Sequence, residues 1–326
     1  MPIPSPAGSR RQRLVDEVAE QGLVLDGTHP AHDLILDELD YALRPPVHER
    51  RVPSYGAIVA PGTAPWAWQE VTGLRIERRP IDPEVARASR GYADGISSWL
   101  LRWDAEHDEG LIFDRPAGSE RDLVVLAQAL GATVVQRHPS GTVRVVGPDG
   151  VFRFDGLWWH HEPMVASWID AVGAGTGSED RQVLERLLQF AVHDLGSDGV
   201  GAILVFRPDR DLPTSFERRL PTPPPLRIGH PPDLAPLRHV LAQIDGATLF
   251  AADGTLREIG VRLVPTTAAE AGVEGYRGMR HTAGRRYSYD DPTAAVIVVR
   301  EDGPVTVLRG GELIAATSSG GPTPGP

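Results

Sequence analysis

Hydrophobic residues recur at helical spacing in the first half of the chain and predict its first elements. Apolar stripes over 14–19 and 34–43 predict two amphipathic helices, and Pro45-Pro46 should end the second. Ser119 is placed to cap a third helix that ends at Gly131. Three runs follow with the short, turn-bounded pattern of strands, at 133–136, 142–146 and 151–154. We therefore expect residues 11–172 to form an α+β domain.

A glycine-rich segment at 173–177 interrupts this pattern and predicts a linker between two domains. Ser178 then begins a helix with an apolar stripe, and 200–206 is an almost continuous apolar strand of the kind buried on both faces. A Pro-rich loop over 212–232 precedes an apolar, helix-like run at 234–244. Two hairpins are expected at 247–263 and 294–308, with a helix starting near Arg280 between them. Residues 178–316 should thus form an α/β domain, a mixed sheet flanked by helices.

Composition narrows the class of protein. The chain has 326 residues, enough for two domains, and a net charge of −11, which is the wrong sign for a nucleic-acid or anionic-membrane surface. It has no cysteine, so disulfides, thiol catalysis and cysteine zinc sites are excluded. No apolar run reaches the roughly 18 residues of a membrane span, and no signal peptide is evident. We expect a cytoplasmic protein with disordered ends at 1–10 and 317–326.

The candidate chemistry lies in the second domain. An acid stands between the helix-like run and the first hairpin strand, in Asp245-Gly246-Ala247, at a junction where α/β folds place ligands. Leu263-Val264-Pro265 ends that hairpin, and Gly278-Met279-Arg280-His281-Thr282 opens the next helix. A strand then ends in Arg300-Glu301-Asp302. Each motif alone is common, since Asp-Gly is ordinary turn chemistry.

In this order and spacing, the motifs resemble those of the diadenylate cyclase (DAC) domain, including the nucleotide-binding domain of the DNA-integrity scanning protein DisA. That family carries Asp-Gly-Ala, Leu-Val-Pro and Gly-Thr-Arg-His-Arg. The chain departs from it twice, with Met279 in place of Thr and Thr282 in place of the second Arg. The resemblance implies a nucleotidyltransferase that condenses two ATP into cyclic di-AMP and releases pyrophosphate. It also implies Mg²⁺ or Mn²⁺ and a homo-oligomer with apposed DAC domains.

The resemblance carries residue roles with it. Asp245, Arg280 and His281 are expected to be catalytic, with Asp245 holding the metal ion. Contacts to the nucleotide are expected from Gly246, Ala247, Leu263, Met279, Arg280, His281, Thr282 and Ala283. Small residues at 246 and 247 let the backbone approach the nucleotide, and Arg280 at a helix start suits a phosphate. Arg285 or Arg286 is expected to reach back and replace the charge missing at Thr282.

The first domain is expected to act as a sensor of an unidentified ligand, and no DNA-binding or membrane domain is expected. The alternative function is a DAC-fold module that binds a nucleotide but has lost turnover. Glu301 is open to two interpretations, an acidic site residue or part of a Glu-Asp-Gly turn. The run Trp158-Trp159-His160-His161-Glu162 is interpreted as a structural aromatic cluster rather than a metal site. Ser97, Ser98 and His107 form no recognisable nucleophile–base pattern.

Overall fold

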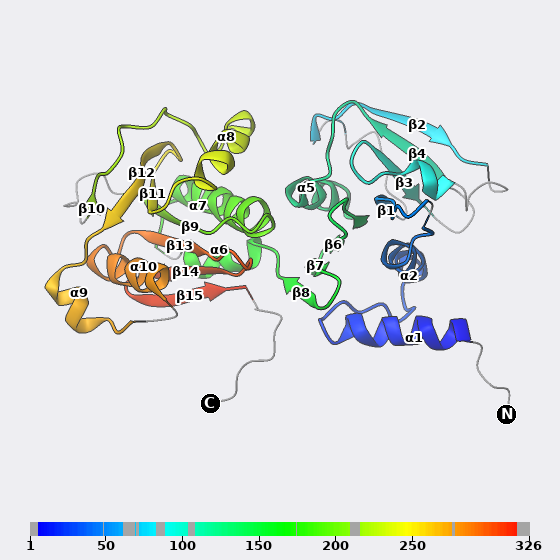
Figure 1. The fold of residues 1–326 in the computed structure, drawn as a ribbon, viewed down its shortest axis with the longest axis horizontal. Coiled ribbons are helices and arrows are strands. Elements are labelled where there is room, and N and C mark those ends of the chain that lie inside the picture. The colour runs from blue at the N-terminus through cyan, green and yellow to red at the C-terminus, as the bar shows by residue number, and fades with distance from the viewer. Residues whose placement is uncertain are drawn as a thin grey trace. The chain divides into compact units, whose positions relative to one another are not determined.

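The computed structural model describes residues 6–47, 49–60, 69, 72–82, 89–103, 108–173, 175–208, 216–275 and 278–317. The chain divides into two compact units, the first ending at Met164 and the second running from Val165 to Thr317 (Figure 1). Each unit has its own sheet and its own hydrophobic core. The mixed α/β class expected from the sequence is therefore confirmed.

The first unit is built on an eight-stranded sheet in the order β2-β4-β3-β1-β5-β6-β7-β8. Its strands are β1 (Tyr55–Val59), β2 (Ile76–Pro80), β3 (Ser98–Arg102), β4 (Asp108–Phe113), β5 (Thr133–Arg137), β6 (Val143–Gly147), β7 (Gly150–Phe154) and β8 (Trp159–Glu162). Its helices are α1 (Pro6–Ala19), α2 (Pro30–Leu43), the short 3-10 turn η2 (Arg90–Tyr92) and α5 (Glu120–Leu130). Helices α1 and α2 contribute to one core cluster and α5 to another.

The helices predicted for this unit form where the pattern placed them. Ser119 accepts a hydrogen bond from the Asp122 amide in a capping box, and Gly131 ends α5 at φ 55°. The pattern missed β1 to β4 and β8, which lack clear alternation with polar residues. The prediction of disorder for residues 1–10 was wrong from Pro6 onward, because Arg10 and Arg11 at the start of α1 pair with acidic side chains of α2. Residues 1–5 lie outside the described ranges.

The second unit contains a seven-stranded mixed sheet in the order β10-β12-β11-β9-β13-β14-β15. Its strands are β9 (Ala202–Arg207), β10 (Phe216–Glu217), β11 (Ala247–Ala251), β12 (Leu256–Leu263), β13 (Ala295–Val299), β14 (Val305–Arg309) and β15 (Glu312–Ala316). Its helical segments are α6 (Ala166–Val172), α7 (Ser178–Phe190), the π-helical turn η3 (Ala191–Gly196), α8 (Pro231–Leu241), α9 (Thr267–Gly272) and α10 (Met279–Asp290).

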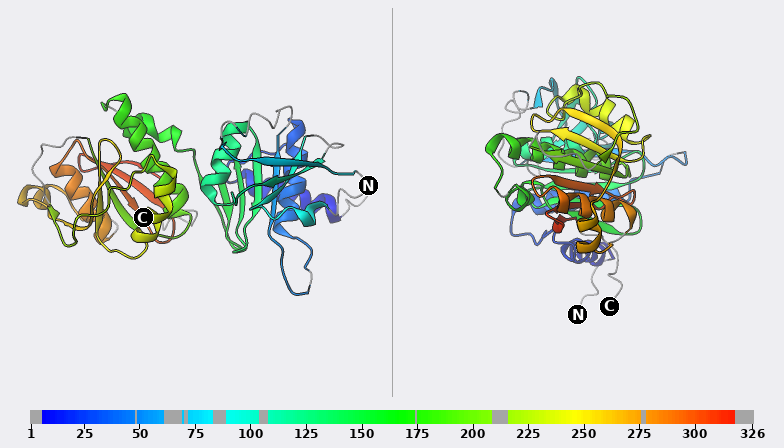
Figure 2. Two further views of the ribbon diagram at one scale, coloured as in Figure 1. Left: turned by 90° about the horizontal axis from the view of Figure 1, so that it is seen from above. Right: turned by 90° about the vertical axis from the view of Figure 1, so that its left-hand side faces the viewer.

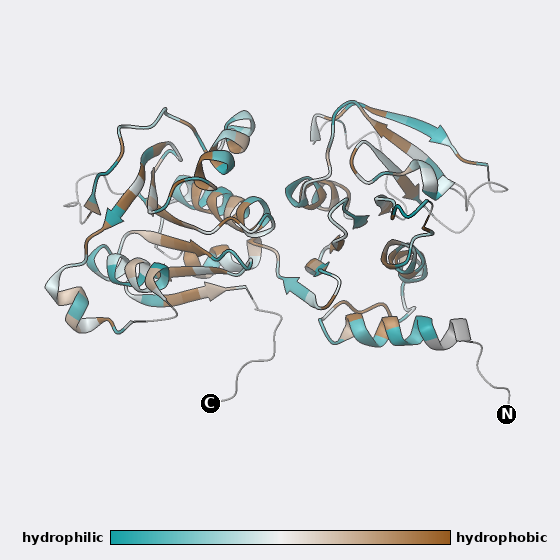
Figure 3. Ribbon diagram, in the orientation of Figure 1, coloured by the Kyte–Doolittle hydropathy of each residue, from teal (hydrophilic) through white to brown (hydrophobic). Residues whose placement is uncertain are grey.

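Strand β9 lies at the centre of this sheet and is buried on both faces, as its sequence predicted. It pairs parallel with β11 and antiparallel with β13. One face packs against α6, α7 and α8, and the other forms a smaller core with Tyr287 of α10 (Figure 2). The central strands are hydrophobic along their length (Figure 3). Burial raises the pKa of Tyr287 to about 12, so its hydroxyl stays neutral.

Three boundaries differ from the sequence prediction. Helix α6 belongs to the second unit, since Trp168, Ile169 and Val172 lie in its core, so the units divide before the glycine-rich segment and not at 173–177. Thr317, expected in a disordered tail, exchanges hydrogen bonds with Val305, while 318–326 lie outside the described ranges. The predicted Pro-rich loop contains the short strand β10 and the start of α8.

Candidate functional site

The predicted site residues of the second unit gather at one end of its sheet. Strands β9 and β11 begin there, whereas their antiparallel neighbours β13 and β12 end there. Asp245 therefore stands at the amino end of β11, not at the carboxyl ends of parallel strands where ligands of α/β folds usually lie. Because Ala202 pairs with Val299, the start of β9 brings Gly201 beside the Arg300-Glu301 turn. Helix α10 begins at the same end, capped by Gly278.

A cavity of about 800 Å³ opens at this end of the sheet. Its volume lies in the range of ordinary small-molecule sites. The apolar part of its wall comes from Ile203, Val261, Leu263 and Val298, which continue the core between the sheet and α10. The remaining lining residues are Arg219, Asp245, Gly246, Ala247, Arg262, Gly278, Met279, Arg280, His281, Ala283, Arg300, Glu301 and Asp302. An apolar wall beside charged groups suits a ligand with a flat base and an anionic tail.

Arg280 lies between two carboxylates of the cavity. Its Nη1 donates to Glu301 at 3.1 Å, and its Nη2 lies 3.9 Å from Asp245. The side chain of Asp245 is 95% exposed and that of Glu301 is 72% exposed, so both carboxylates are open to solvent. Glu301, which the sequence left open between a site residue and a turn residue, is both: it begins the turn and it lines the cavity.

Two glycines make this arrangement possible. A Cβ on Gly201 would stand 2.3 Å from Nη1 of Arg280, so the guanidinium could keep this position only beside a glycine and would otherwise have to shift. Gly246 has φ 111°, and a Cβ there would stand 2.8 Å from the backbone carbon of Gly260 in β12. The turn carrying Asp245 is thus pressed against the neighbouring strand.

His281 is buried behind the cavity rather than projecting into open solvent. Only 2% of it is exposed, and its Nε2 lies 3.2 Å from the hydroxyl of Thr306 on β14. This contact ties the first turn of α10 to the sheet. His281 also lines the cavity, so the nucleotide contact and the catalytic role expected for it from the sequence stay predictions.

The predicted replacement for the missing second Arg is not seen. Thr282 does not appear among the lining residues, and its hydroxyl donates to the carbonyl of Gly278 at 3.0 Å. Arg285 donates to the carbonyl of Gly311 at 2.6 Å, and Arg286 to that of Val273 at 3.3 Å. Neither arginine lines the cavity. Both side chains instead hold α10 to the segments around it.

Sequence reasoning missed two arginines of the cavity. Arg262 lies on β12 directly before the Leu263-Val264-Pro265 motif. Its position next to a predicted site residue could have marked it as a candidate. Arg219 follows β10 inside the Pro-rich loop, where no local pattern marked it. The antiparallel pairing of β10 with β12 brings Arg219 to the cavity.

In the first unit, side chains of the aromatic and histidine run around β8 make packing and hydrogen-bond contacts, and the interpretation of the run as a structural cluster stays a prediction. The indole of Trp159 donates to Glu17 at 2.8 Å, and His161 stacks on Phe152 with ring centroids 4.3 Å apart. Ser98 is the first residue of β3, and its amide donates to Asp94, as does the amide of Ser97 in the preceding turn. His107 lies outside the described residues.

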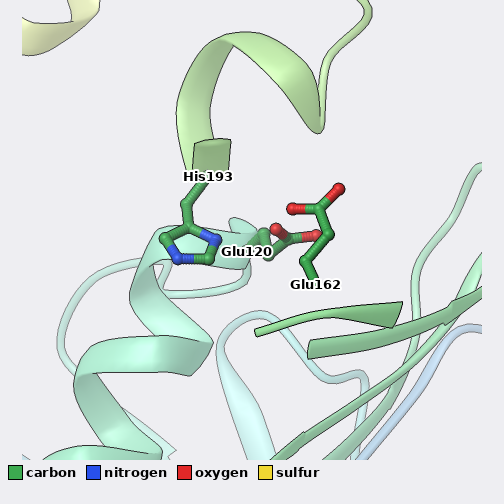
Figure 4. Close-up of side chains that lie close together, drawn as sticks. All are labelled: Glu120, Glu162 and His193. Carbon is green, nitrogen blue, oxygen red and sulfur yellow. The ribbon is translucent and has the colours of Figure 1, made fainter. Parts of the chain in front are cut away.

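Two buried glutamates of the first unit, Glu120 and Glu162 (Figure 4), both pair with Arg153. Nη2 of Arg153 donates to Glu120 at 3.0 Å and lies 2.6 Å from Glu162. Burial alone would lower the pKa of this guanidinium, but the two carboxylates raise it above its usual value. His193, labelled in the same view, belongs to η3 of the second unit, where only 2% of it is exposed.

The fold and the cavity together define a two-domain protein with a ligand-binding α/β domain. Comparison with known families makes this specific. Residues 189–313 match the family model described as the DisA bacterial checkpoint controller nucleotide-binding domain (DAC), and residues 12–162 match the model of the probable sensor domain DACNK. The chain therefore carries a nucleotide-binding DAC domain preceded by a probable sensor domain, which confirms the resemblance found in the sequence. This supports a function of the diadenylate cyclase type.

Other comparisons add little. No curated protein matches the chain. One similar solved structure is described as the hypothetical membrane spanning protein from Bacillus cereus, with 18% identity and a TM-score of 0.31 over 43% of this chain and 72% of that one. At this identity and TM-score, the two chains are only weakly similar. Among the helices of the described residues, none has the length and apolar character of a membrane span.

Proposed function

We propose that this protein is a diadenylate cyclase that condenses two ATP molecules into cyclic di-AMP and releases pyrophosphate. One observation carries the proposal above the others. A single cavity of the DAC domain brings together the exposed carboxylate of Asp245, the start of α10 with Arg280, and an apolar wall that includes Leu263. These are the groups needed at the reacting hydroxyl, the phosphates and the base.

In each of two transfers, the 3′-hydroxyl oxygen of one nucleotide forms a bond to the α-phosphorus of the other. The bond from that phosphorus to the oxygen bridging to the β-phosphate breaks, pyrophosphate leaves, and the hydroxyl proton passes to solvent. Such a reaction depends mainly on positioning and charge stabilisation. Since the attacking and attacked groups belong to different nucleotides, two cavities must face each other. The active unit we propose is a homo-oligomer with apposed DAC domains.

The donor set of the cavity fits a divalent cation. Mg²⁺ is usually held by one or two carboxylates together with substrate phosphates, and the carboxylates of Asp245 and Glu301 line the same space. Mg²⁺ or Mn²⁺ bound there supplies charge neutralisation at the phosphate and lowers the pKa of the attacking hydroxyl. We assign Asp245 as the metal ligand, with Glu301 near enough to Arg280 to influence the same phosphate.

Arg280 and the start of α10 form the proposed phosphate site. The first amides of a helix have no partner within the helix and favour an anion, and a guanidinium adds charge-assisted donors. In the structure the guanidinium of Arg280 donates to the carboxylate of Glu301. When a phosphate binds, its oxygen takes the place of that carboxylate as the acceptor. In this proposal, adenine packs against the apolar wall formed by Ile203, Leu263 and Val298.

One observation favours the alternative of a nucleotide-binding module without turnover. Thr282, which stands where the family has a second arginine, faces the carbonyl of Gly278 and not the cavity. The positive charge that the second arginine would bring to the phosphates must then come from another residue of the cavity. Without such a residue, the domain would bind a nucleotide but not turn it over.

The test is to incubate the purified full-length protein with ATP and either Mg²⁺ or Mn²⁺ and to separate the products by chromatography. Cyclic di-AMP and pyrophosphate should appear together. Parallel melting curves with ATP, and with cyclic di-AMP, report binding by mass action. A nucleotide-induced rise in melting temperature without product, under both metals and at several protein concentrations, would establish the alternative. No product and no thermal shift would reject both functions.

A further inference from the structure

The charge balance of the DAC cavity depends on two arginines outside the family motifs. Among the residues that the structure describes, four arginines and three carboxylates line the cavity, although the whole chain carries a net charge of −11. Within this described set, removal of Arg219 and Arg262 would leave two arginines facing three carboxylates. These two arginines therefore contribute half of the described positive charge that an anionic ligand meets.

The other two arginines of the cavity are already engaged with carboxylates. Arg300 makes a two-pronged contact with Asp302, with Nε at 2.7 Å and Nη2 at 2.5 Å. Arg280 donates to Glu301 at 3.1 Å. In contrast, the contact of Arg262 within the described residues is a long one of 3.8 Å to Glu217, and its side chain is 63% exposed. Arg219, also exposed, has no hydrogen bond or ion pair to another residue of the described ranges.

Strand pairing holds Arg219 and Arg262 close to the turn that carries Asp245. Strand β10 pairs antiparallel with β12, so that Glu217 lies opposite Arg262 and the following residues run back along β12. Nε of Arg218 donates to the buried Glu258 at 2.7 Å, which anchors the segment to the strand. A Cβ on Gly260 would meet Leu220 at 2.8 Å and the carbonyl of Asp245 at 3.4 Å. The segment carrying Arg219 therefore passes directly beside the turn that carries the proposed metal ligand.

We infer that Arg219 and Arg262 bind the terminal phosphates of a nucleoside triphosphate and supply the charge that Thr282 does not. This inference rests on the proposed function, because it places a nucleotide in the cavity. The pair comes from the β10–β12 side of the sheet, whereas Arg280 and Arg300 come from the α10 and β13 side. The triphosphate is thus held from two sides, with the α-phosphate near Asp245 and Arg280 and the leaving pyrophosphate near Arg219 and Arg262.

The experiment compares nucleotides that differ only in their terminal phosphates. Binding of ATP, AMP and inorganic pyrophosphate is measured by calorimetry for the full-length wild type and for Arg219→Ala, Arg262→Ala and the double variant, each with Mg²⁺. We expect each single change to weaken ATP binding roughly five- to tenfold, at the modest end for charge-assisted contacts because both side chains are exposed. AMP affinity should be unchanged, and pyrophosphate binding should weaken in parallel with ATP. Lysine at either position should restore part of the loss.

Arg257→Ala is the matched control, because Arg257 is also an exposed arginine of β12 but does not line the cavity. Its ATP affinity should equal that of the wild type. If the double variant binds ATP as tightly as the wild type, this inference is overturned, whereas the proposed nucleotide site still stands. Equal losses for ATP and AMP would also overturn it, since they would place the arginines away from the terminal phosphates. A wild type that binds none of the three ligands would reject the proposed function itself.

Discussion

Replacement of Gly246 by alanine tests the close contact that sets the position of Asp245. Two costs add at this residue. A non-glycine residue at φ 111° costs about 1–3 kcal/mol in backbone strain. Its Cβ would also stand 2.8 Å from a backbone carbon of Gly260 and 2.9 Å from the carbonyl oxygen of Val261, and relief of such overpacking costs roughly 1–3 kcal/mol more.

Gly278→Ala is the matched control, because Gly278 has nearly the same φ of 105° and lines the same cavity, but a Cβ there meets nothing within 4 Å. The Gly278→Ala variant should therefore lose only the stability that corresponds to backbone strain. At about 2–4 °C per kcal/mol for a domain of this size, the melting temperature should fall by ~4–24 °C in Gly246→Ala and by about half as much in the control.

The assay is thermal unfolding of both full-length variants by circular dichroism, with nucleotide binding measured on the protein that remains folded. Gly246→Ala should also weaken binding, since β11 or β12 must shift and Asp245 moves with it. Equal losses of stability in the two variants, within about 0.5 kcal/mol, would refute the reasoning. That outcome would mean that β12 yields to the new methyl group without cost.

Three further changes have definite expectations. Asp245→Asn should leave the fold intact and reduce cyclic di-AMP formation below a tenth of wild type, a barrier increase of more than about 1.4 kcal/mol; higher residual activity would remove the metal role from Asp245. Glu38→Gln in the first unit should cost roughly 3–5 kcal/mol of unfolding free energy, because fully buried Glu38 accepts hydrogen bonds from Tyr55 and from Arg90 at 2.7 Å; a loss under 1 kcal/mol would contradict the network. A fragment beginning at Val165 should melt higher than one beginning at Ser178, since only the longer one keeps α6 and the 3.1 Å bond from Arg309 to the carbonyl of Val172; equal melting temperatures would show that α6 adds no stability.

Local signals in the sequence determined most elements of the second unit. The start of α7, the apolar strand β9 and the two Asp-Gly hairpins each carry their information within a few residues, as turn chemistry or hydrophobic period. The same is true of the DAC motifs, whose order along the chain was enough to assign the family. In the first unit, Ser119 and Gly131 marked α5 for the same reason.

Elements held mainly by distant contacts gave no comparable signal. Residues 6–10 have a composition typical of disorder, yet Arg10 and Arg11 of α1 pair with acids of α2 that lie 22 to 30 positions away, farther than any local window reaches. Strand β1 is buried along its whole length between β3 and β5 and shows no alternation. Helix α6 is too short to reveal that it packs with the residues after the glycine-rich segment and not with those before it.

The candidate site divides in the same way. The sequence by itself predicted that Asp245, Leu263 and Arg280 would belong to one site, because each stands in a motif with a fixed place in the chain, and all three line the same cavity. Only the tertiary structure decided which cations share the cavity with them. Helical spacing pointed to Arg285 and Arg286, but their partners are backbone carbonyls of neighbouring segments. Arg219 reaches the cavity through the pairing of β10 with β12, and strand pairing over more than forty residues depends on the packing of the whole sheet, not on the residues beside it.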